Sequence, residues 1–310
     1  MYKFVKNVVI YGVIFFLLLG MLNYRYESTK ALSYIDKFDN VPDNIVLFNT
    51  GSSHGLCDFC YDELEMNGNY FNFGINSQSL SYDYRLLQQY EDNFSEGAIC
   101  FIPVSYFAVL QDEEVTENFA EKNARYYKFL EPQYIKQYNM TEDICVRYFP
   151  VLSSKEGLIS ILLKKKSNVN QFEIDWNRKT SEEEAYENAA GAVKRHVIDY
   201  KKNGTWEVNQ DEIDALKDMI VFCKDREITP IMVTTPYLAE YNDQIPEEFK
   251  AYFLNVVRSV ADEYDVKYYD YSEDARFSKQ YDLFMNSDHL NRNGAIMFTE
   301  ILLEEIEREK

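Results

Sequence analysis

Basic side chains are scarce in this 310-residue sequence. It carries 32 Lys and Arg against 52 Asp and Glu, a formal net charge of −20. Such a charge repels phosphate backbones, so we expect no nucleic-acid partner. The chain also lacks internal repeats and low-complexity tracts, which excludes a repeat array. With 46% hydrophobic and 16% aromatic residues, the composition indicates a packed globular domain, one α/β domain with an insertion, rather than a disordered chain.

Cysteine is too rare and too scattered for a disulfide framework. The five cysteines are an odd set, and only Cys57 and Cys60 form a C-x-x-C pair. A zinc site would need a second such pair or a pair of histidines, so we predict no metal and no cofactor. Two free half-buried thiols are favoured over a local disulfide, and both over metal binding.

The N-terminal segment is typical of a membrane anchor. Lys3 and Lys6 precede the apolar run Val8–Leu22, close to the roughly 20 residues that cross a bilayer. No small-residue cleavage pattern follows, which favours an uncleaved anchor. Cationic residues before the span favour an inside N-terminus and an extracytoplasmic domain. We therefore predict a signal anchor over residues 1–28, with the span at about 8–22, and a linker over residues 29–43.

Residues 44–310 predict a single α/β domain. The run Ile45–Asn49 is short, apolar and rich in β-branched residues, as expected of a central parallel strand. Strands and helices alternate along the chain, which indicates βαβ units and a three-layer α/β/α sandwich with a central parallel sheet. Residues from about 111 to 209 interrupt this alternation and are predicted to be a helical insertion. The other predicted strands are Ala98–Val104, Thr229–Thr235 and Val266–Tyr271, and the helices are Tyr82–Asn93, Ser181–Tyr200, Gln210–Arg226, Pro246–Tyr264 and Asn293–Glu307.

The turn after the first predicted strand is a candidate site for a nucleophile. Gly51-Ser52-Ser53-His54 follows that strand directly. In an open parallel sheet, ligands bind at the carboxyl ends of the strands. Amides at the start of the next helix could stabilise an oxyanion beside Ser53. Taken singly, the motif is more often an ordinary helix N-cap.

A serine nucleophile needs a base, and the chain has only three histidines. His196 lies beside Lys194 and Arg195, which indicates a solvated helix face. His54 neighbours Ser53 in sequence, which usually points two side chains apart. His289, just before the last predicted helix, is the remaining candidate.

These residues resemble the SGNH/GDSL hydrolase superfamily, in particular its membrane-anchored DltD-like and polysaccharide O-acetylation branches. The resemblance rests on the strand followed by Gly51-Ser52-Ser53-His54, on Asn72-Phe73-Gly74, on Ile102–Phe107 and on Asp288-His289-Leu290-Asn291 before a final helix. It implies Ser53 as nucleophile and His289 as base. It also implies that the amides of Ser53 and Gly74 form the oxyanion hole, with Asn76 or Ser105 as a further donor.

The sequence departs from the superfamily three residues before His289, where Asn286 replaces the usual Asp. An Asn can orient an imidazole but cannot stabilise an imidazolium by charge. Three alternatives stay open: Asn286 as a neutral orienter, Asp288 as the substitute acid, or a weakened or inactive catalyst.

The resemblance implies acyl-ester chemistry on a cell-surface carbohydrate. The expected function is an extracytoplasmic serine enzyme, an O-acyl(acetyl)transferase or esterase acting on a polysaccharide or a teichoic-acid-like polymer. A membrane-bound O-acyltransferase partner that delivers the acyl donor would explain the anchor. The alternative is a non-catalytic glycan-binding or scaffold protein of a cell-envelope complex. Because one fold hosts many activities, the fold alone does not decide between them.

Overall fold

The computed structural model describes residues 1–29, 35–64, 67–111, 123–153 and 175–309. The chain divides into two compact units. The first comprises residues 1–39 and 117–173, and the second residues 40–116 and 174–310. The predicted insertion over 111–209 is therefore shared between them: its middle part groups with the N-terminal segment, and residues 174–209 group with the sheet.

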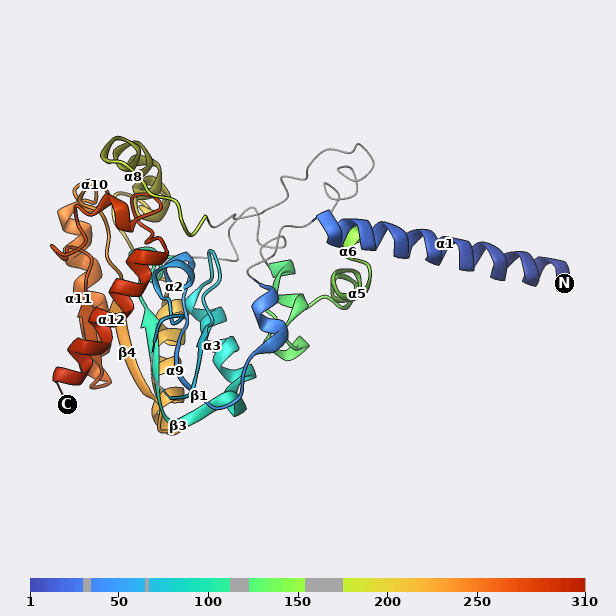
Figure 1. Ribbon diagram of the computed structural model, residues 1–310, viewed down its shortest axis with the longest axis horizontal. Coiled ribbons are helices and arrows are strands. Elements are labelled where there is room, and N and C mark those ends of the chain that lie inside the picture. The colour runs from blue at the N-terminus through green and yellow to red at the C-terminus, as the bar shows by residue number, and fades with distance from the viewer. Residues whose placement is uncertain (30–34, 65–66, 112–122, 154–174, 310) are drawn as a thin grey trace. The chain divides into compact units, whose positions relative to one another are not determined.

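The second unit is built on a parallel sheet, which confirms the predicted fold class (Figure 1). The strand order is β2-β1-β3-β4-β5. Sequence analysis missed β2, whose residues Asn-Tyr-Phe-Asn lack a continuous apolar run. The strands are β1 Ile45–Asn49, β2 Asn69–Asn72, β3 Phe94–Pro103, β4 Thr229–Thr234 and β5 Lys267–Asp270.

Helices cover both faces of this sheet. On one face α3 packs along α9, and α9 is joined to α11 by an ion pair of 2.7 Å between Lys217 and Glu263. On the other face α2 packs against α12, where Phe101 of β3, Val233 of β4 and Phe298 of α12 share one apolar core. The bounds are α2 Ser53–Asp58, α3 Leu80–Gln89, α8 Glu182–His196, α9 Gln210–Asp225, α10 Ala239–Asn242, α11 Glu247–Glu263 and α12 Arg292–Arg308.

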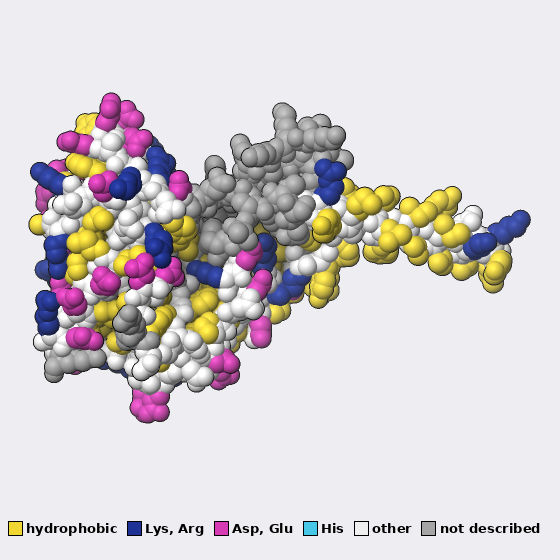
Figure 2. Space-filling view, viewed as in Figure 1, with side chains coloured by type: hydrophobic (Ala, Val, Ile, Leu, Met, Phe, Trp, Pro, Cys, Tyr) yellow, Lys and Arg dark blue, Asp and Glu magenta, His cyan; other side chains and the backbone are white. Residues whose placement is uncertain are grey.

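The first unit contains the long N-terminal helix α1, Tyr2–Thr29, together with α5, Met140–Tyr148, and α6, Pro150–Ser153. Within the described residues, α1 is the one helix long and apolar enough to cross a membrane, by length and composition. Figure 2 shows apolar side chains along its length, with basic side chains at its N-terminal end. Part of the predicted linker, residues 30–34, lies outside the described residues.

All five cysteines are free in the structure. Cys57 is fully buried on α2, whereas Cys60 is partly exposed just after it. The C-x-x-C pair is therefore two thiols rather than a disulfide, although Cys57 is more deeply buried than the sequence indicated.

Candidate active site

The turn between β1 and α2 is held tightly at the carboxyl edge of the sheet. Gly51 adopts a positive φ of 111°, which L side chains rarely adopt, and its amide donates to Asp83 Oδ1 at 2.7 Å. Buried Asn49 donates from Nδ2 to the carbonyls of Thr50 and Gly55, both at 2.8 Å. These bonds fix the start of α2, and with it the positions of Ser53 and His54.

Ser53 is the first residue of α2, and its side chain is buried. Within the described residues its hydroxyl takes part in no side-chain hydrogen bond. Its pairing with His289 therefore stays a prediction. Catalytic hydrogen bonds often tighten only when substrate is bound, so this geometry leaves the pairing open.

The C-terminal segment that carries His289 folds back onto α2. Met285 donates its amide to the carbonyl of His289 at 2.9 Å, which closes a tight loop. The Leu290 amide donates to Asp58 Oδ1, on the last residue of α2, at 2.9 Å. Asp58 is completely buried, so this bond fastens the histidine loop to the helix that begins at Ser53.

Asn286 determines which nitrogen of His289 carries the proton. Its Oδ1 accepts the backbone amides of Asp288 and His289, at 3.1 and 2.9 Å. Two amide donors at one atom identify that atom as the oxygen of the side-chain amide. The same oxygen lies 3.2 Å from His289 Nδ1, so Nδ1 must be the donor. Nε2 is then the basic nitrogen, as a general base for a serine requires.

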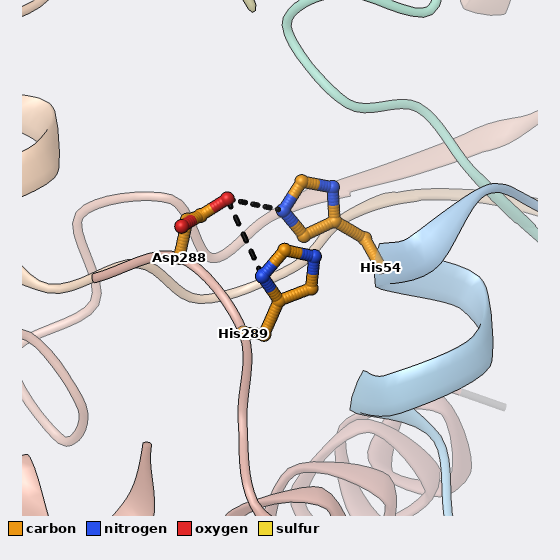
Figure 3. Close-up of side chains that lie close together, drawn as sticks. All are labelled: His54, Asp288 and His289. Atoms are coloured by element: carbon orange, nitrogen blue, oxygen red, sulfur yellow. Dashed lines mark ion pairs between the residues drawn. The ribbon is translucent and has the colours of Figure 1, made fainter. Parts of the chain in front are cut away.

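Asp288 Oδ2 is surrounded by all three histidines of the chain. It lies 3.4 Å from His289 Nδ1, 3.5 Å from His54 Nε2 and 3.8 Å from His196 Nδ1. Figure 3 shows the carboxylate facing the first two rings, which reach it from α2 and from the C-terminal loop. Both Asn286 and Asp288 therefore face Nδ1 of His289, one as a hydrogen-bond acceptor and the other as a charge.

Ionisation in this cluster is set by burial. Burial lowers the pKa of His289 to about 3 and that of His196 to about 4, so both rings are neutral at neutral pH. Burial opposes the ionisation of Asp288, but the attraction of this carboxylate to His289 and to His54 outweighs burial and holds the pKa of the carboxyl well below its usual range. At neutral pH the Asp288 carboxylate therefore lies beside the neutral rings of His196 and His289.

His196 does not lie on a solvated helix face, so that expectation was wrong. Its ring contacts Phe107, with centroids 4.7 Å apart, and its Nδ1 lies 2.9 Å from the hydroxyl of Tyr241. Lys194 and Arg195 are exposed, but His196 is the last residue of α8 and turns inward. The charged neighbours in sequence concealed this, because a helix end can present successive side chains to opposite environments.

The predicted oxyanion-hole residues have distinct environments. Gly74 packs so closely on α2 that an added Cβ would lie 2.3 Å from the Leu56 amide nitrogen, and its own amide donates to Asn72 Oδ1 at 2.8 Å. Asn76 accepts a bond of 3.4 Å from Ser77. The Ser105 hydroxyl lies 2.7 Å from His54 Nδ1. As oxyanion donors, these residues and the Ser53 amide stay predictions, and Gly74 would have to release Asn72.

His54, Asp288 and His289 could also be considered as metal ligands, since their ligand atoms lie within 4.8 Å of one another. However, the rings of His54 and His289 are stacked at an interplanar angle of 13°. An imidazole lone pair lies in the plane of its ring, so two stacked rings do not direct their nitrogens at one ion at the 2.0–2.1 Å that zinc requires. The arrangement suits charge pairing and proton transfer better than metal coordination.

Sequence reasoning missed Asp58, His54 and His196. Asp58 is five residues after Ser53 and carried no motif of its own. The scarcity of histidine was the available signal for the other two: a chain with three histidines in 310 residues brings all three to one carboxylate.

No protein-family model and no curated protein matches this sequence. Several solved structures resemble it at low similarity. One, from Bacteroides fragilis and described as a candidate acylhydrolase, is 12% identical with a TM-score of 0.41, over 91% of this chain and 97% of that one. Another, from Bacillus subtilis, is 11% identical with a TM-score of 0.42, over 87% of this chain and 58% of its own. At these values neither structure assigns an activity to this chain.

Proposed function

We propose that this protein is a membrane-anchored serine acyl-ester enzyme of the SGNH type, with its domain on the extracytoplasmic side. The observation that carries the proposal is the state of His289. Asn286 and Asp288 both face its Nδ1, at 3.2 and 3.4 Å, which leaves Nε2 as the base. This is the arrangement that a serine nucleophile needs, and Asp58 fastens it to the helix of Ser53.

In the proposed mechanism, Nε2 of His289 takes the proton of Ser53 while Oγ attacks an acyl-ester carbonyl. The oxyanion collapses, the leaving alkoxide takes the proton from His289, and the acyl group stays on Ser53. An acceptor hydroxyl then gives its proton to His289 and attacks the acyl-serine. When this second oxyanion collapses, Ser53 Oγ leaves and takes the proton back from His289. The Asp288 carboxylate stabilises the imidazolium in both steps, as the acid of a catalytic triad does.

For the substrate we propose an acetyl or similar acyl ester of a cell-surface polysaccharide or a teichoic-acid-like polymer. The sequence resemblance and the anchor helix support this choice. With a sugar hydroxyl as acceptor the enzyme is an O-acyltransferase, and with water it is an esterase. A membrane-bound O-acyltransferase that delivers the acyl group is the partner we propose for the transfer reaction.

The test is covalent labelling with a fluorophosphonate probe, which reacts with activated serines. Wild type and Ser52→Ala should be labelled, and Ser53→Ala should not. Ser105→Ala is the essential comparison, because Ser105 to His54 is the one serine–histidine hydrogen bond between side chains in the described residues. If Ser105→Ala lost the label and Ser53→Ala kept it, the nucleophile would be Ser105 and not Ser53. An unlabelled wild type would instead favour a glycan-binding or scaffold protein.

A further inference from the structure

The short helices α5 and α6 both expose large apolar side chains. Met140, Ile144 and Tyr148 follow one another at four-residue spacing on α5, and Leu152 continues the spacing on α6. Their exposed fractions are 67%, 42%, 67% and 51%. Residues four apart lie on the same side of a helix, so Met140, Ile144 and Tyr148 form a continuous strip on α5. Leu152 adds an exposed apolar side chain on α6, and these four residues are called here the α5–α6 strip.

The rest of α5 is already engaged with its own unit. Val146, about 160° around the helix from the middle of the strip at 100° per residue, is buried. Asp143 and Arg147, which border the strip, form an ion pair with each other, and Arg147 also donates to the carbonyl of Leu130 at 2.7 Å. The strip is therefore the apolar face that folding leaves exposed.

The α5–α6 strip lies next to the end of the anchor helix. Asn23 of α1 donates to the carbonyl of Tyr148 at 3.1 Å and accepts the amide of Val151 at 3.2 Å. Asn23 directly follows the predicted span over residues 8–22, and Leu19, one turn earlier, is buried. One side chain thus holds both short helices at the level where α1 would leave the bilayer.

We propose that the α5–α6 strip lies in the interfacial region of the same bilayer that α1 spans, on the side where Asn23 emerges; this rests on the proposed membrane anchor. Figure 1 shows α1 running across the view and α5 seen nearly end-on, so α5 does not continue in the direction of α1. An interfacial helix likewise lies beside the spanning helix and does not extend it. Tyrosine and apolar side chains on one face are what such an interfacial helix buries among the headgroups.

The experiment places a tryptophan on the strip in the full-length protein, reconstituted in phosphatidylcholine vesicles. Tyr148→Trp is compared with Tyr186→Trp on α8, whose parent tyrosine is equally exposed, at 66%. Tyr24→Trp, just beyond the predicted span, reports whether α1 is inserted. Emission is recorded with ordinary lipids and with lipids brominated on the acyl chains, after subtraction of the wild-type signal from Trp176 and Trp206.

The tryptophan emission of Tyr148→Trp and of Tyr24→Trp should lose intensity in brominated lipid, whereas that of Tyr186→Trp should not. In ordinary lipid, the emission maxima of the first two variants should lie at shorter wavelength than that of Tyr186→Trp. Quenching of Tyr24→Trp alone would overturn the proposed strip and leave the anchor intact, so that the strip would be free for a protein partner. Quenching of neither would overturn both the anchor and the strip. Neither result would bear on the serine chemistry, which the fluorophosphonate probe tests separately.

Discussion

The imidazole rings of His54 and His289 stack with their centroids 4.6 Å apart, although one residue follows the first strand and the other precedes the last helix. The stack presents one edge of each ring to the same Asp288 oxygen. This oxygen therefore lies beside the imidazolium that forms when His289 takes a proton from serine. His54 packs against the base and faces the same carboxylate.

Asp288 should carry the electrostatic part of catalysis. Asp288→Asn keeps the shape of the loop but removes the charge beside Nδ1 of His289. The precedent of the serine proteases gives a loss of about 10⁴ in kcat, which corresponds to about 5 kcal/mol of barrier at 1.36 kcal/mol per tenfold. The measurement is the rate of cleavage of a small acetyl ester, with Ser53→Ala as the blank.

Asn286→Asp and Ser287→Ala are the matched comparisons for that loss. Asn286→Asp adds a second carboxylate close to Asp288, and like-charge repulsion should make it neutral or harmful. Ser287→Ala removes only a hydrogen bond of 3.0 Å to Asp288 Oδ1 and should change little. A large gain from Asn286→Asp with a small effect of Asp288→Asn would show that Asp288 does not support the base. Ester cleavage that never exceeds the blank would leave transfer or binding as the activity.

His54 should stabilise the site without being the base. His54→Phe keeps an aromatic ring against His289 but leaves the buried Ser105 hydroxyl without its partner, at a cost of about 1–3 kcal/mol of unfolding free energy. The double variant with Ser105→Ala should cost less than the sum of the single variants, because the unpaired hydroxyl is then removed. Thermal unfolding measures this coupling.

Fluorophosphonate labelling of Ser53 separates the roles of the two stacked rings. It should survive His54→Phe at a reduced rate and disappear in His289→Phe. The opposite pattern would make His54 the base and direct attention to Ser105.

The parallel sheet could be predicted because β1, β4 and the helices have strong local patterns, whereas β2 and the full environment of the base could not. The prediction of Ser53 as nucleophile and His289 as base rested on two motifs at opposite ends of the chain. The roles of His54, His196 and Asp58 depend on tertiary contacts between segments far apart in sequence, and no local pattern encodes these. Asn286 illustrates the limit: its residue type was known, but only the loop shows that its oxygen accepts two backbone amides and fixes the tautomer of His289.

The orientation of the anchor gives a topological prediction. Because Lys3 and Lys6 precede the span, the domain should lie outside the cytoplasm. Protease added to intact cells should therefore degrade the domain, while a cytoplasmic marker protein stays whole. Protection of the domain, or a mature N-terminus beyond Leu22, would contradict this orientation.

Asp58 should make the stability of the domain depend on pH in a specific way. Burial raises the pKa of Asp58 from 3.8 to about 7, so the folded protein holds a proton that the unfolded chain releases near pH 4. Its contribution to stability is therefore greatest below about pH 4 and is lost as the pH rises toward 7. At 1.36 kcal/mol per pKa unit the whole effect is about 4 kcal/mol.

Asp58→Asn keeps an oxygen that can accept the Leu290 amide but removes this titration. The variant should match wild type near pH 4 and be more stable by a few kcal/mol above pH 7, as measured by thermal unfolding in detergent at a series of pH values. His196 and His289 act in the opposite sense, because their lowered pKa values remove stability as the pH falls below about 6.5. Wild type and Asp58→Asn share both histidines, so this effect cancels in the difference between their stabilities. Asp62→Asn is the control; Asp62 is an exposed carboxyl just beyond α2 that pairs with Arg292, and its replacement should give a small difference, because exposed ion pairs contribute little to stability. If Asp58→Asn instead raised the stability by the same amount at every pH, the Asp58 carboxyl would already be ionised at pH 4 in the folded protein. The gain would then come from better packing.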